Sequence, residues 1–245
     1  MPGLADHILV FILAIALPVY AIISWKSFQR KLGAGKPRVR LNGYMETLLV
    51  QWSFTLALLL LWWLREREYS GLGLSISWNF RFYVGTAAAL AGCIFLIRQW
   101  IRVLRLSGQI PDSLRNQIKP VADMMPRTWL ERKFFITVSL TAGICEEILY
   151  RGFLVWYVDQ YATWLVACAV SALFFGFGHL YQGRAGILKT TAVGLFLVLL
   201  YLWSGSLIGP MILHAVTDIT GGLIGSEVVS AVSRSKQSYA NTPAV

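Results

Sequence analysis

Seven long apolar runs dominate this chain and restrict its fold more than any other feature. A helix needs about 20 mostly apolar residues to cross a bilayer, and each run is close to that length. The sequence therefore predicts an all-α fold, a polytopic integral membrane bundle of seven or eight transmembrane helices. The runs cover residues 7–25, 46–64, 82–97, 134–158, 163–178, 186–203 and 206–226.

The composition agrees with a membrane protein. Hydrophobic residues make up 56% of the 245 residues and charged residues 14%, whereas an ordinary soluble domain carries about 25% charged residues. The expected location is the inner cell membrane, as a multi-pass protein in constant contact with the lipid bilayer.

The basic residues predict how the chain is oriented. Residues 26–45 carry six Lys or Arg and no acidic residue, and residues 98–133 carry eight against three acidic residues. Because basic loops face the cytoplasm, these two loops are predicted to be cytoplasmic, with the N-terminus outside and the C-terminus inside. The net charge of +10 then reflects topology and contact with anionic lipid. Nucleic acid is not predicted as a partner, since the basic residues do not line one soluble face.

The distribution of polar residues divides the chain into three predicted parts. Residues 1–133 are expected to form an N-terminal membrane scaffold with a cytoplasmic amphipathic loop, and residues 134–226 a membrane core that holds every unusual polar residue. Residues 227–245 are polar towards the end and contain Pro243, which predicts a disordered cytoplasmic tail. In the loop, "RQWIRVLRL" at 98–106 fits either a surface helix or the frayed end of the third span.

Ionisable side chains inside the last four runs indicate a functional site. Such a residue costs about 2.5–3.5 kcal/mol at the centre of a membrane helix, so it usually faces a partner or a water-filled cavity. Because each would be costly alone, we expect these side chains to meet. The candidate site residues are Glu146, Glu147, Arg151, His214 and Asp218 inside these runs, and His179 directly after the 163–178 run.

Helical spacing predicts different roles for the two adjacent glutamates. Residues four apart share a face, so Glu147 is expected to pair with Arg151. Glu146 points about 100° away around the helix, and no cation lies four residues after it on its own face. Glu146 is therefore the candidate general base, with a histidine sharing its water. His214 and Asp218, also four apart, could donate hydrogen bonds to a developing oxyanion.

Metal binding is the alternative chemistry for these residues. Two histidines and a carboxylate are the ligands of many catalytic zinc sites. The H-E-x-x-H signature is absent, however, and the available ligands come from three separate helices. The sequence therefore favours catalysis without a cofactor, with zinc as the minority alternative.

Three motifs, in order, resemble the CAAX protease and bacteriocin-processing (Abi) family. They read Glu146-Glu147-Ile-Leu-Tyr-Arg151, then Phe175-Gly-Phe-Gly-His179, then His214-Ala-Val-Thr-Asp218. The resemblance covers roughly 134–226 and includes the type II CAAX prenyl endopeptidases, which are glutamic intramembrane proteases. It implies that Glu146 and His179 activate water, and that His214 and the residue four positions on stabilise the oxyanion. That last residue is typically Asn in the prenyl endopeptidases, and Asp in other branches.

The predicted function is hydrolysis of a peptide bond in a membrane-associated protein or peptide. One alternative is a proton-coupled carrier that uses Glu146, His179, His214 and Asp218 as a relay, although the sequence lacks inverted repeats. The other is a non-catalytic membrane partner or immunity protein. The protease prediction also requires His179 to approach the other site residues. His179 lies near the end of its span, whereas the other groups lie near the middle of the membrane. They meet if the 163–178 helix tilts or the cavity lies in the cytoplasmic half.

Overall fold

The computed structural model describes residues 1–106 and 109–240, and this part of the chain is almost entirely helical. Its helices are α1 (Leu4–Phe11), η1 (Ile12–Ala16), α2 (Leu17–Gly33), α3 (Val39–Leu64), η2 (Tyr69–Leu72), α4 (Phe80–Arg105), α5 (Asp112–Ile118), η3 (Lys119–Met124), α6 (Trp129–Glu146), η4 (Glu147–Leu154), α7 (Val155–Asp159), α8 (Trp164–Gly178), η5 (Leu180–Gln182), α9 (Gly183–Ser204) and α10 (Ile208–Ala240).

The predicted fold class is confirmed, since helices cover all seven apolar runs. Within the described part of the chain, five helical stretches are long and apolar enough to cross a membrane. Helix α8 is apolar but shorter, and α6 continues through η4 and α7 as one helix that carries several charges. The five stretches are Leu4–Gly33, Val39–Leu64, Phe80–Arg105, Leu180–Ser204 and Ile208–Ser235.

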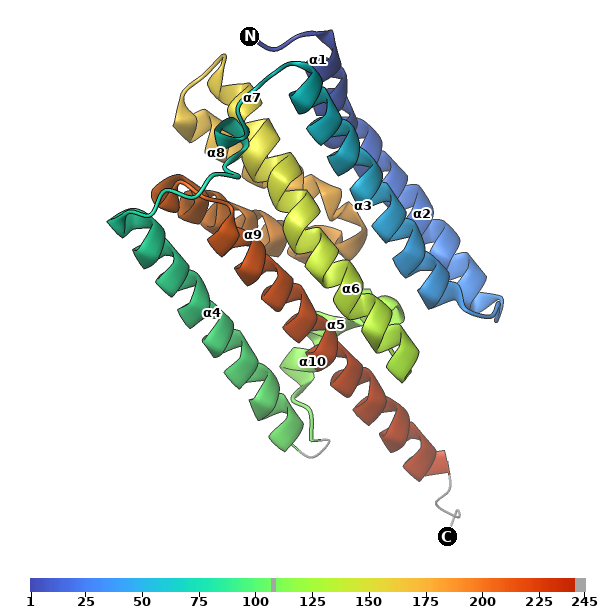
Figure 1. Ribbon diagram of the computed structural model, residues 1–245. Coiled ribbons are helices and arrows are strands. Elements are labelled where there is room, and N and C mark those ends of the chain that lie inside the picture. Colours follow the sequence, from blue (N-terminus) through green and yellow to red (C-terminus); the bar gives the residue numbers. More distant parts are fainter. Residues whose placement is uncertain (107–108, 241–245) are drawn as a thin grey trace.

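Helices α3, α6, α10 and α4 lie side by side in this order across the bundle (Figure 1). Helix α2 runs beside α3 at one edge, and α8 and α9 pack on each other behind this layer. Since α6 contacts both α3 and α10, its polar residues can reach side chains on either neighbour. The arrangement therefore places the acidic pair at the centre of the bundle.

The acidic pair lies where the helix changes its geometry. After Glu146 the chain continues as a π-helical segment, η4, and every residue of η4 is buried. Such segments are rare, and they occur frequently at functional sites. Close packing supports the position of the helix, because a Cβ atom on Gly143 would lie 2.7 Å from the Met211 carbonyl oxygen and 2.8 Å from the Ala215 Cβ. Glycine at this position lets α6 approach α10 closely.

Residues 227–240, which the sequence predicts to belong to a disordered tail, are helical in the structure. Helix α10 continues to Ala240, and residues 241–245 lie outside the described residues. Val228 and Ala231 are buried in a cluster with Ile110. This burial holds residues after 226 in the helix, because apolar positions on one face pack against the 98–133 loop.

The structure also distinguishes the two alternatives for residues 98–106, a surface helix or the end of the third span. Helix α4 runs without interruption to Arg105, so this stretch continues the third span. The rest of the loop packs against the start of α3, where Tyr44 donates a hydrogen bond to the Met124 carbonyl at 2.6 Å. Arg40 Nε donates to the Asp123 carbonyl at 2.8 Å. The loop and the start of α3 thus form one end of the bundle.

Candidate active site

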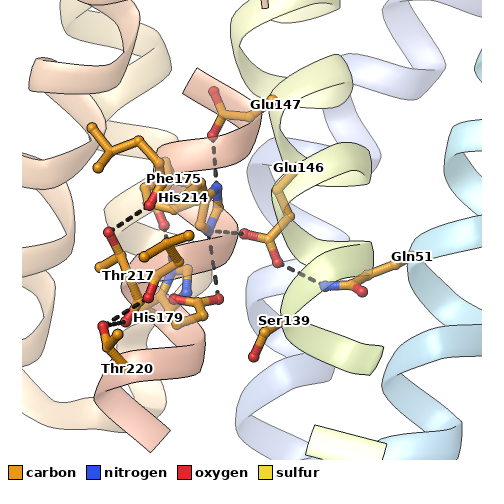
Figure 2. A network of polar contacts seen from close by, with 12 residues as sticks. Gln51, Ser139, Glu146, Glu147, Phe175, His179, His214, Thr217 and Thr220 are labelled. Carbon is orange, nitrogen blue, oxygen red and sulfur yellow. Dashed lines mark hydrogen bonds and ion pairs between the residues drawn. The ribbon is translucent and has the colours of Figure 1, made fainter. Parts of the chain in front are cut away.

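The ionisable residues predicted to meet do lie close together. Glu146 and Glu147 come from the α6–η4 junction, and His214 and Asp218 come from α10. His214 lies between the two glutamates, with one ring nitrogen towards each (Figure 2). The histidine is therefore the link between the acidic pair and α10.

Glu147 and Arg151 form the ion pair that their spacing predicts. Glu147 Oε1 lies 2.9 Å from Arg151 Nη1, and both side chains are 0% exposed. The guanidinium carbon of Arg151 also lies 4.0 Å from the centre of the Phe175 ring, a cation–π contact. The pair lies within one buried helical segment, and the contact of Arg151 with Phe175 joins it to α8.

Glu147 has a second contact that the sequence did not reveal. Its Oε1 lies 2.7 Å from His214 Nδ1. Because a carboxylate oxygen accepts, Nδ1 must carry the hydrogen, and this fixes the orientation of the ring. Glu147 therefore positions His214 in addition to pairing with Arg151.

The other nitrogen of His214 faces the remaining two carboxylates. Nε2 lies 3.8 Å from Glu146 Oε2 and 3.6 Å from Asp218 Oδ2. Both distances exceed a hydrogen bond. When Nε2 also carries a hydrogen, this N–H can donate to an additional oxygen. Asp218 is 41% exposed and so is open to a ligand.

Glu146 differs from its neighbour because it borders a cavity. Its side chain is 18% exposed, and it lines a cavity of about 660 Å³ between α2, α3 and the α6–η4 junction. This volume is typical of a ligand site. Aromatic side chains form much of the wall: Tyr20, Trp25, Phe28, Tyr44, Phe54, Tyr150 and Tyr181. A carboxylate here can reach both bound molecules and the ring of His214.

His179 lines the same cavity at the end of α8. Its Nδ1 lies 2.8 Å from the Phe175 carbonyl oxygen, so Nδ1 carries the hydrogen and donates. Nε2 is then the acceptor nitrogen of the neutral ring. Glu146 and His179 thus reach one cavity from different helices.

Phe175 connects the two histidines, a role that sequence spacing alone did not show. Its ring centre lies 4.9 Å from that of His179 and 5.6 Å from that of His214, edge-on to the latter. Its carbonyl fixes one histidine and its ring packs on the other. The phenylalanine of the second motif is therefore a central packing element of the site.

Gln51 is a site residue that the sequence analysis missed. It lies on α3, and its Nε2 donates a hydrogen bond of 2.8 Å to Glu146 Oε1 (Figure 2). A polar amide inside the second apolar run was the available signal. No helical spacing relates it to Glu146, because the two residues are far apart in the chain.

The arrangement of potential metal-binding side chains offers little support for a bound metal ion. Within the part of the chain that the structure describes, no group of three or more His, Cys, Asp or Glu side chains is placed to hold a metal ion. The prediction of cofactor-free catalysis stays a prediction, which a chelator can test.

Fold and site together define a class of protein: a multi-pass helical membrane protein with a carboxylate–histidine cluster beside an internal cavity. Residues 128–220 match the family model described as type II CAAX prenyl endopeptidase Rce1-like. The matched segment is similar to the CAAX protease family, and the resemblance predicted from the three motifs is confirmed. Similarity to this family indicates a protease, and so a hydrolase. No curated protein and no solved structure matches the chain.

Proposed function

We propose that this protein is an intramembrane endopeptidase that hydrolyses a peptide bond with a water molecule activated by Glu146. The observation that carries the proposal is the difference between the two glutamates. Glu147 is fully buried against Arg151, whereas Glu146 and His179 line one cavity. A general base must reach its substrate, and this requirement selects Glu146.

The proposed reaction begins with water between Glu146 and His179. Glu146 takes a proton as the water oxygen attacks the scissile carbonyl carbon, while His179 Nε2 accepts the other hydrogen as a hydrogen bond. The carbonyl oxygen becomes an oxyanion. The same proton then passes from Glu146 to the amide nitrogen, the C–N bond breaks, and a carboxylic acid and an amine leave.

His214 is suited to stabilise the oxyanion in this scheme. Its Nε2–H points between Glu146 and Asp218, and Glu147 holds the ring in place through Nδ1. Preorganised donors of this kind each contribute about 10²–10³ in rate. Asp218 can add a second donor only when protonated, because an ionised carboxylate accepts and would repel the oxyanion.

The substrate is proposed to be a membrane-associated protein or peptide whose apolar part enters the aromatic cavity. The orientation proposed from the basic loops places the N-terminus outside the cell membrane and the C-terminus in the cytoplasm.

A comparison of membrane and secreted proteomes between cells with the wild-type protein and cells with Glu146→Ala tests this function. We expect intact precursors to accumulate in the variant, and their cleavage to be restored by wild-type protein in liposomes, with or without a chelator. Identical proteomes together with proton-coupled flux in liposomes would favour a carrier. Recovery of a chelated, inactive sample by zinc would favour a metallopeptidase.

A further inference from the structure

Gln51 brings the N-terminal region into the candidate active site. It lies on α3, outside the matched segment 128–220, and it lines the same cavity as Glu146. Its Nε2 donates to Glu146 Oε1 at 2.8 Å, the distance of a charge-assisted hydrogen bond. The scaffold therefore contributes a polar contact to the proposed general base.

The chemistry of this contact favours one form of Glu146. An amide N–H donates to an ionised carboxylate, and such a bond stabilises the charged form. The reverse orientation of the amide would bring two acceptor oxygens together, so the donor assignment follows from the network. A partly buried carboxylate loses hydration, and the Gln51 donor offsets that loss.

The contact also fixes the direction of the carboxylate. Gln51 occupies Oε1 and leaves Oε2 facing His214 Nε2 at 3.8 Å. This separation is too long for a direct hydrogen bond. Oε2 is buried without a hydrogen-bond partner, and it is the oxygen that faces His214.

We propose that Gln51 is a positioning residue that donates to Glu146 Oε1 and so keeps Oε2 directed towards His214. This inference rests on the proposed role of Glu146 as general base. Other ionisable groups face the carboxylate as well, so the effect of Gln51 has to be measured against theirs. They are His214 and Asp218 on α10, Cys145 on α6, Glu147 and Tyr150 on η4, His179 at the end of α8, and Tyr181 on η5.

Gln51→Met separates this role from simple packing, because methionine keeps the length of the side chain and removes the donor. We expect kcat to fall about tenfold or more, the effect of losing a hydrogen bond to a charged group. Glu146 must be ionised to act, so the acidic limb of the pH–rate profile should move to higher pH by about one unit. Loss of packing alone would lower the folded amount and leave that limb in place.

Thr137→Val is the matched control. Thr137 lies exposed on α6, the helix that carries Glu146, and its hydroxyl bonds to the Lys133 carbonyl of its own helix. This variant also removes one polar group from a membrane helix, yet it should keep the wild-type rate and pH profile.

A second measurement reads Glu146 directly. Infrared difference spectra identify its carboxyl band as the band lost in Glu146→Gln, and the band is then titrated in wild type and in Gln51→Met. A titration that moves to higher pH supports the proposal even if no peptide is cleaved, in which case the proposed function alone fails. An unchanged titration overturns the role of Gln51, whether or not the protein is a protease.

Discussion

Two adjacent glutamates perform different tasks in this protein because their surroundings differ. Glu147 is enclosed with Arg151, and it also holds His214. Glu146 faces a cavity and receives a hydrogen bond from Gln51. The i,i+4 spacing predicted the first ion pair, and the angle between neighbouring residues predicted that Glu146 would point elsewhere. Neither pattern could predict the Gln51–Glu146 contact or the Glu147–His214 contact, since each of these contacts joins two helices that are distant in the sequence.

Glu147→Gln should lower the amount of folded protein. The substitution leaves the guanidinium of Arg151 buried without its charge partner, and breaking a buried pair costs about 3–5 kcal/mol. Thermal unfolding in detergent, with size-exclusion chromatography of the extracted protein, measures the effect. Glu146→Gln serves as the control and should unfold like wild type. Equal stability of Glu147→Gln and wild type would contradict a structural role for the pair.

Asp218→Asn should keep most activity and lose less rate at high pH than wild type. Glu147 already fixes the His214 tautomer through Nδ1, so Asp218, which faces Nε2, is more suited to donate to the oxyanion itself. The protonated acid donates, and ionisation as the pH rises removes that donor, whereas the amide keeps one at every pH. The pH–rate profiles of both proteins provide the test. A rate loss of about 10²-fold or more at every pH would exclude this arrangement. Such a loss would approach the effect of changing Asp to Asn in the Ser-His-Asp triad of a serine protease, where the carboxylate orients the histidine.

At the scale of the helices, the site depends on how closely α6 approaches α10. The side chains of Glu147 and His214 meet at 2.7 Å because the backbones pack tightly at Gly143. The apolar runs predicted each of these helices. They could not predict the crossing point, because that depends on the shapes of two facing surfaces. The extension of α10 beyond residue 226 was missed for the same reason, since it depends on burial against Ile110.

Gly143→Ala should weaken both folding and activity. Its methyl group would lie 2.7 Å from the Met211 carbonyl oxygen, so α6 and α10 must separate. Overpacking of this kind costs about 1–3 kcal/mol. Gly221→Ala on α10 is the matched control, because a Cβ there has nothing within 4 Å. Unfolding temperature and cleavage rate are compared for the two variants. If they behave alike, close packing at Gly143 is not required.

For the whole molecule, the basic segments gather at one end of the bundle. The α2–α3 connection, the end of α4, the start of α6 and the end of α10 lie at the lower end of Figure 1, opposite the N-terminus. The alternation of basic and less basic loops in the sequence predicts this grouping. The cavity that Glu146 borders is also lined by Lys31, Lys36 and Arg40 from this end.

A cysteine placed at Lys36 should be inaccessible from outside the cell. The predicted orientation puts this loop in the cytoplasm, so an impermeant thiol reagent should label Lys36→Cys after permeabilisation and not in intact cells. The three native cysteines are buried and give little background. Labelling in intact cells would reverse the orientation.

The most direct test of the account is the cleavage rate of Glu146→Gln, measured with purified protein in liposomes on a substrate found in the proteome comparison. The variant keeps the shape of the side chain and the buried Glu147–Arg151 pair, so it should fold and unfold like wild type. Because the amide cannot accept the proton from water, we predict a rate loss of about 10²-fold or more. Cleavage at the wild-type rate by the folded variant would show that Glu146 is not the general base.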